Sequence, residues 1–140
     1  MLAHRGFELM AETECRDLLG FRSIGHIALS IGALPAIFPV NYVLDGDSIV
    51  FRTANGTQSA DSTIRAVLAF ETGYTDPSGR GGWSVLVVGM ASEIVDRAVR
   101  MRLAADHPSG WSPAEADRLF RLPIDMISGT RILKAARTAA

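Results

Sequence analysis

Short segments in which apolar and polar residues alternate recur through most of the chain. Alternation at every second position is typical of a β-strand with one buried face. The connections before residue 60 are too short for the crossovers of roughly a dozen residues that parallel neighbours need, so antiparallel pairing is expected. The pattern predicts six strands, at residues 25–31, 36–44, 48–53, 66–71, 83–95 and 121–127.

Turn-forming residues separate these strands. Gly32-Ala33-Leu34 and Asp45-Gly46-Asp47 are expected to form hairpin turns. Gly89, inside the longest β-rich run, predicts a bend of the kind found at a barrel corner. Thr13 is expected to cap the first of four short helical segments, at residues 13–19, 58–62, 97–105 and 113–119. The predicted fold class is mainly β with short α, as a small antiparallel barrel.

Length and composition fit one cytoplasmic domain that spans residues 1–140. A chain of 140 residues is long enough for a single core. The net charge of -1 gives no electrostatic footprint for nucleic acid. Cys15 is the only cysteine, which excludes an internal disulfide. The N-terminus has no signal-peptide pattern and no apolar run reaches transmembrane length, so no membrane partner is expected.

The common catalytic and metal-binding motifs are not found. His4, His26 and His107 have no metal-ligand spacing, so no metal is expected and His26 is interpreted as a structural residue of a strand. The segment Gly82 to Leu86 lacks the second glycine of the G-x-S-x-G elbow. Neither G-x-G-x-x-G nor the P-loop pattern occurs. The sequence therefore identifies no catalytic residue.

A polar segment follows the strand at residues 48–53 and offers hydroxyl, amide and backbone N–H groups. Residues of this type bind phosphate at the N-terminus of a helix, and the same types form a turn with a capped helix. Both interpretations stay open from the local sequence. Arg52 lies beside the segment and is suited to a charge-assisted bond. The polar residues are Thr53, Asn55, Gly56, Thr57, Gln58 and Ser59.

Together these pieces resemble the flavin-binding split-barrel proteins of the pyridoxamine 5'-phosphate oxidase-like superfamily, and small bacterial members above all. The resemblance covers nearly the whole chain, from the first helix to about Ile132. The combination is specific, although no single piece is. The matching segments are Pro39-Val40-Asn41-Tyr42, Asp45-Gly46, Ile49-Val50-Phe51-Arg52-Thr53, Gly56-Thr57, Gly82-Trp83-Ser84-Val85-Leu86-Val87, Gly89 and Ile127-Ser128-Gly129-Thr130-Arg131-Ile132.

The resemblance implies a six-stranded antiparallel split barrel that forms a homodimer, with two FMN molecules in clefts between the protomers. It implies that Arg52 and Thr53, with the loop that carries Asn55, Gly56, Thr57, Gln58 and Ser59, hold the ribityl phosphate. Trp83 and Ser84 would reach the flavin of the partner subunit. The isoalloxazine ring would lie against Pro39, Val40, Asn41 and Tyr42.

One departure from the family pattern concerns the phosphate loop. Many relatives carry a lysine where this chain has Gln58, and loss of that cation weakens phosphate binding by about 1–3 kcal/mol if nothing replaces it. Our interpretation is an FMN-binding oxidoreductase of undefined small-molecule substrate. Three alternatives stay open: a deazaflavin-dependent reductase with the same cleft, a non-catalytic flavin carrier or sensor, and a degenerate barrel that only dimerises.

Overall fold

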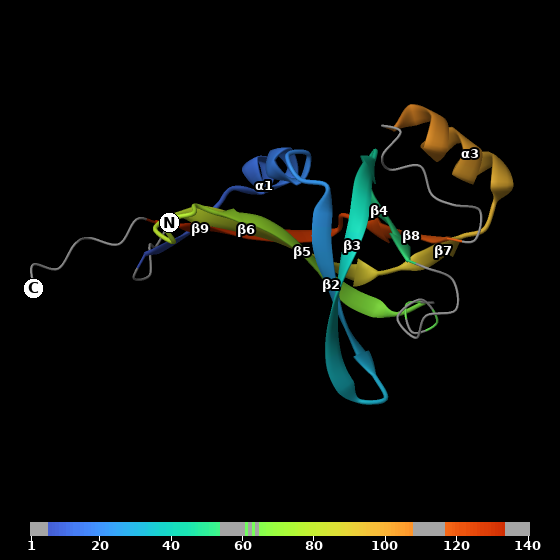
Figure 1. Ribbon diagram of the computed structural model, residues 1–140, viewed down its shortest axis with the longest axis horizontal. Helices are drawn as coiled ribbons and strands as arrows, with labels where there is room; N and C mark the ends of the chain where they lie inside the picture. Colours follow the sequence, from blue (N-terminus) through green and yellow to red (C-terminus); the bar gives the residue numbers. More distant parts are fainter. Residues whose placement is uncertain (1–5, 54–60, 62, 64, 108–116, 134–140) are drawn as a thin grey trace, which may run out of the picture.

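A computed structural model describes residues 6–53, 61, 63, 65–107 and 117–133. In this part of the chain, nine strands form one antiparallel sheet and two helices pack against it (Figure 1). The helices are α1 (Glu12–Leu19) and α3 (Arg97–Asp106). The strands are β1 (Phe7–Leu9), β2 (Ile24–Ile31), β3 (Leu34–Asp45), β4 (Ser48–Thr53), β5 (Val67–Thr75), β6 (Gly82–Met90), β7 (Ser92–Ile94), β8 (Arg118–Pro123) and β9 (Met126–Ile132).

The sheet confirms the predicted mainly β, antiparallel fold class. Its strand order is β1-β9-β6-β5-β2-β3-β4-β8-β7. Both expected hairpins are present, because Ile31 pairs with Leu34 and Asp45 pairs with Ser48, which leaves two residues in each turn. In the described residues no ladder joins the outermost strands β1 and β7. Closure of the sheet into a six-stranded barrel therefore stays a prediction.

The long run at residues 83–95 is divided into two strands. β6 pairs with β5 and β9, whereas β7 pairs with β8. Ala91 alone separates them, and its N–H donates to the carbonyl of Ala66 at 2.9 Å. The expected bend therefore occurs two residues after Gly89.

The strand expected at residues 121–127 is wrong in its bounds, because β8 ends at Pro123 and β9 begins at Met126. The helix expected at 113–119 is wrong at its end, where Arg118 and Leu119 belong to β8. Leu119 and Phe120 are both buried, since α3 covers one face of β8 and the main core covers the other. Buried neighbours remove the alternation that marks a strand. The first helix is also not capped by Thr13: its N-cap is Ala11, without a side-chain bond.

The main core lies on the face of the sheet that α1 covers. Tyr42 and Phe70 meet edge to face, with ring centroids 4.8 Å apart, and Leu19 and Cys15 of α1 are completely buried. Gly129 permits this close approach of helix and sheet, because a Cβ there would lie 2.5 Å from the Cys15 sulfur. A bulkier residue at that position would displace α1.

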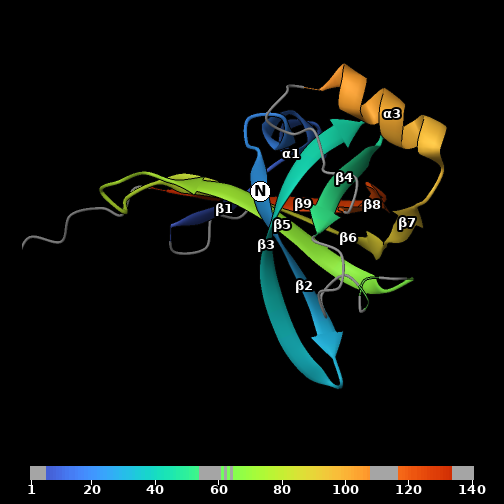
Figure 2. The same cartoon turned by 45° about the vertical axis from the view of Figure 1, so that its right-hand side comes forward.

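A second core lies beneath α3, on the face of β4 and β8 opposite the main core. Figure 2 shows α3 on the side of β4 away from α1. It contains Val50, Ile94, Leu103 and Leu119. Asp96 caps the helix, since its carboxylate accepts from the N–H groups of the second and third residues after it. Neither helix of the described residues is long and apolar enough to span a membrane.

Candidate functional site

The alternation of β3 sorts its four predicted cofactor residues onto two faces. Val40 and Tyr42 are buried in the main core, and the Tyr42 hydroxyl donates to the carbonyl of Leu19 at 2.6 Å. Burial raises the pKa of Tyr42. Pro39 and Asn41 are exposed on the other face. A ligand against this strand would therefore meet the side chains of Pro39 and Asn41 and the strand backbone.

β4 places Arg52 and Thr53 beside that strand. Asn41 pairs with Arg52 in the ladder, so their side chains share a face. Thr53, the last residue of β4, is buried, and within the described residues its Oγ1 is the one buried side-chain atom without a hydrogen-bond partner. A buried hydroxyl without a partner costs about 1–3 kcal/mol. Because neighbouring side chains of a strand alternate, Thr53 points to the side of Phe51, opposite to Asn41 and Arg52. The orphaned hydroxyl therefore fits a ligand group that reaches the end of β4 and supplies the missing hydrogen bond.

The polar loop after β4 cannot be compared with its prediction. Asn55, Gly56, Thr57, Gln58 and Ser59 lie outside the described residues. The turn expected at residues 58–62 is likewise outside them, apart from Asp61, whose carboxylate pairs with Arg118 at 2.8 Å. The phosphate-binding role of the loop stays a prediction.

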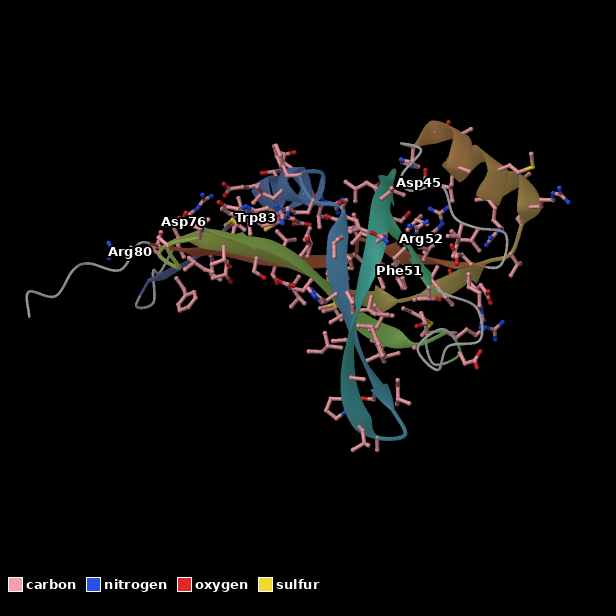
Figure 3. The ribbon with its side chains drawn as sticks, in the orientation of Figure 1. Asp45, Phe51, Arg52, Asp76, Arg80 and Trp83 are labelled. Carbon is pink, nitrogen blue, oxygen red and sulfur yellow. The ribbon has the colours of Figure 1, made fainter. Side chains whose placement is uncertain are left out.

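Trp83 and Ser84 lie far from β4 in the sheet. β3, β2 and β5 separate β4 from β6, and Figure 3 shows Arg52 and Trp83 on different arms of the molecule. Four strand spacings of about 4.8 Å add up to roughly 19 Å. Trp83 packs against the main core, whereas the Ser84 hydroxyl donates to Glu71 Oε2 at 2.9 Å. The structure therefore brings together the predicted residues of β3 and β4, and does not bring Trp83 and Ser84 to them.

A cavity of about 440 Å³ lies at the second of these groups, lined by Arg22 and by residues of β2, β5, β6 and β9. Its lining includes Trp83 and Ser84. It also includes His26 and Glu71, which the sequence analysis did not assign to any ligand. Nδ1 of His26 is 3.6 Å from Oε1 of Glu71. Sequence reasoning missed this pair because only the pairing of β2 with β5 brings the two residues opposite each other. No group of three or more potential metal ligands occurs in the described residues.

Comparison with known proteins decides the family. The family model of pyridoxamine 5'-phosphate oxidase matches residues 11–131. The chain belongs to this family. The resemblance found in the sequence is thereby confirmed, and the match extends from the residue before α1 to the next-to-last residue of β9.

One relative of this family member is uncharacterized protein Rv0080 of Mycobacterium tuberculosis, which is 32% identical to this chain. The match covers 89% of this chain and 85% of that protein. The FAD-binding protein of Mycobacterium smegmatis is 30% identical, with a TM-score of 0.72 over 89% of this chain and 97% of that one. A FAD-binding protein of Mesorhizobium loti is 19% identical, with a TM-score of 0.71 over 89% and 97% of the two chains. The last comparison shows the shared fold.

The chain also exposes an apolar surface over β2, β3, β5, β6 and β9, on the sheet face opposite the main core and outside the area that α3 covers; we call this surface the open face. The ladders bring Ile37 of β3, Val88 of β6 and Met126 of β9 into one row across that face. The large apolar side chains that are exposed there are Ile24, Ile37, Val67, Leu86, Met90 and Met126. Of the run expected to meet a second copy, Val85 and Val87 instead fill the main core.

Proposed function

We propose that this protein is an FMN-dependent oxidoreductase that acts on a small molecule. The observation that carries the proposal is the orphaned Thr53 hydroxyl at the end of β4, next along the strand to Arg52, whose side chain shares a face with the exposed Asn41 of β3. Membership of the pyridoxamine 5'-phosphate oxidase family and the FAD-binding relative that is 30% identical support a flavin as the ligand. FMN is the part of FAD that carries the reactive ring, so the same residues would serve either form.

Different residues would hold different parts of the cofactor. The backbone of β3, with Pro39 and Asn41, would lie along the ring, and Thr53 would donate or accept the hydrogen bond that it lacks within the described residues. Arg52, opposite Asn41 in the ladder, has the charge and planar shape that favour a phosphate. The flavin supplies the electron-transfer chemistry, and the protein supplies orientation and exclusion of water.

We also propose that a second copy of the chain covers the open face and completes the cofactor cleft. The separation of Trp83 and Ser84 from Arg52 supports this dimer. Within one protomer the two predicted groups of cofactor-binding residues lie far apart, so residues of two protomers would be needed to line one cleft. A two-fold dimer makes two equivalent clefts, each lined by both chains. An apolar open face is the kind of surface that an obligate dimer buries.

Titration of the cofactor-free protein with FMN, FAD and a deazaflavin tests the proposal. We expect FMN uptake that Thr53→Val weakens about fivefold, because the hydroxyl contributes about 1 kcal/mol to binding. The same variant should leave the free energy of unfolding without FMN unchanged or higher, since valine removes a buried polar atom that has no partner.

Thr72→Val is the matched control for stability. The Thr72 hydroxyl donates to the carbonyl of Ile24 at 2.9 Å, so its loss should lower the free energy of unfolding. If the protein takes up only the deazaflavin, the deazaflavin replaces FMN in the proposal. Uptake of a cofactor without turnover of any electron acceptor would indicate a flavin carrier. Failure to take up any of the three cofactors would overturn the proposal.

A further inference from the structure

Three polar side chains form a continuous row across adjacent strands of the open face. His26 of β2 lies directly opposite Glu71 of β5, and its Nδ1 is 3.6 Å from Oε1. Oε2, the other oxygen of the same carboxylate, accepts the hydrogen bond from Ser84 of β6 at 2.9 Å. Glu71 is thus held between an imidazole and a hydroxyl, and all three residues line the 440 Å³ cavity.

This row is poorly explained as a stabilising feature. The side chains of His26 and Glu71 are 51% and 43% exposed, and an exposed ion pair contributes about 0–1 kcal/mol. The row instead lies beside the strand proposed for the cofactor, because His26 is also directly opposite Pro39 of β3. Directly opposite side chains have Cβ atoms about 5 Å apart.

The surroundings of His26 are mixed in polarity and suit a small molecule that has both an apolar part and polar groups. Ile24, Trp83 and Ile132 contribute apolar or aromatic surface to the cavity lining. The other charged or titratable lining residues are Glu71, Arg22 and Tyr74, and the guanidinium of Arg22 lies over the Tyr74 ring, 5.7 Å from its centroid. Across from His26 on β3, Pro39 carries no charge.

We propose that this cavity is the substrate site and that His26 is its proton donor, oriented by Glu71 as a positioning residue that Ser84 holds in place. The inference rests on the proposed flavin function. It assigns the substrate class as a small conjugated molecule with a carbonyl oxygen that takes up a proton on reduction, such as a quinone. A histidine beside a carboxylate is a common donor of this kind.

The proposed step balances with a quinone as acceptor and reduced flavin as the source of electrons. A reduced flavin, when bound, would supply the quinone with a hydride, which is one proton with two electrons. His26 gives the second proton from Nε2: that N–H bond breaks, an O–H bond forms, and the product is the hydroquinone. Glu71 holds the imidazole in position from its Nδ1 side during the transfer, and solvent at the cavity mouth returns the proton.

A comparison of two electron acceptors distinguishes proton donation by His26 from other roles of this residue. Protein is loaded with FMN, reduced without oxygen, and mixed in a stopped-flow instrument with duroquinone or with ferricyanide, which takes one electron and no proton. His26→Gln should slow duroquinone reduction about tenfold or more and leave ferricyanide reduction unchanged. Glu71→Gln should slow the duroquinone reaction alone and to a smaller extent. His107→Gln, the same change after α3 and outside the cavity, should alter neither rate.

A binding measurement tests the site without turnover. Diethyl pyrocarbonate modifies histidines, and in the oxidised FMN-loaded protein duroquinone should slow the modification of His26 but not of His107. Equal effects of His26→Gln on both acceptors, or no protection of His26, would overturn the proposed site while FMN uptake stands. Failure of FMN uptake would overturn the proposed function and this site together.

Discussion

Neighbouring residues of β3 have different roles because their side chains point to opposite faces of the sheet. The Tyr42 hydroxyl is bonded to the carbonyl of Leu19, the last residue of α1, and its ring packs on Phe70. Asn41 is exposed and faces Arg52. The side chain of Tyr42 is therefore a structural link between the sheet and α1.

Paired substitutions on β3 test this division. Tyr42→Phe should lower the free energy of unfolding by about 1–2 kcal/mol, because it leaves the buried Leu19 carbonyl without its donor. Asn41→Ala should change stability by less than about 0.5 kcal/mol, as is usual for exposed positions, and should weaken FMN binding. Urea unfolding and FMN titration of both variants measure the two effects. A stability loss confined to Asn41→Ala would contradict the division.

At the scale of elements, one carboxylate ties α3 to the hairpin of β3 and β4. Asp45 accepts from Arg102 of α3 at 3.1 Å and from Arg121 of β8 at 2.8 Å. The bond from Arg102 is the largest cause of its pKa falling from 3.8 to about 2. The helix that covers the second core is thus anchored at the hairpin turn, close to Gly46.

The lowered pKa of Asp45 predicts a defined pH dependence of stability. A depressed pKa means that the folded state binds the proton less tightly than the unfolded chain, so the stabilisation is present above about pH 4 and is lost as the pH falls toward 2. Asp45→Asn should remove about 1 kcal/mol at pH 6 and less at pH 2, after allowance for solvent screening.

Urea unfolding at several pH values measures this dependence. Asp47→Asn is the control, because that side chain is 96% exposed and its pair with Arg16 spans 3.4 Å. We expect the control to cost less than about 0.5 kcal/mol at every pH. A stability difference between Asp45→Asn and the wild type that does not shrink in acid would show that the carboxylate charge is not the cause.

For the whole molecule, the important feature is the unequal covering of the sheet. α1 covers the main core and α3 covers the second core, whereas the open face has no covering element in the described residues. Exposed apolar patches of this kind mark interaction sites. The proposed dimer would bury the apolar residues of the open face, leave the mouth of the cavity accessible, and bring Trp83 and Ser84 of one protomer to the cofactor of the other.

Two methionines allow a matched test of the dimer. Met126 is 67% exposed on the open face and Met101 is 62% exposed on α3. Met126→Glu places a charge in the proposed interface, so it should shift the protein toward monomer and weaken FMN binding, whereas Met101→Glu should do neither. Sedimentation at low micromolar concentration measures the state, and the buried area should exceed ~2,000 Å². A stable wild-type monomer that binds FMN tightly would contradict the shared cleft.

By itself the sequence determined the elements that depend on local pattern. Alternation located β2, β3, β4 and β5, and turn residues located both hairpins, because side-chain direction and turn geometry are set within a few residues. Local motifs, taken together, also identified the family. The same local reasoning failed at β8, whose two buried faces hide the alternation.

Only the tertiary structure decided what long-range pairing controls. The ladders brought His26 beside Glu71 and Ser84, put Pro39 and Asn41 on the open face, and left the Thr53 hydroxyl without a partner among the described residues. No property of these residues in the chain indicates such neighbours, because register and the covering of each face depend on strands that are distant in sequence. The sequence therefore determined the strands and the family, and strand pairing and packing determined where a ligand and a second copy would find their contacts.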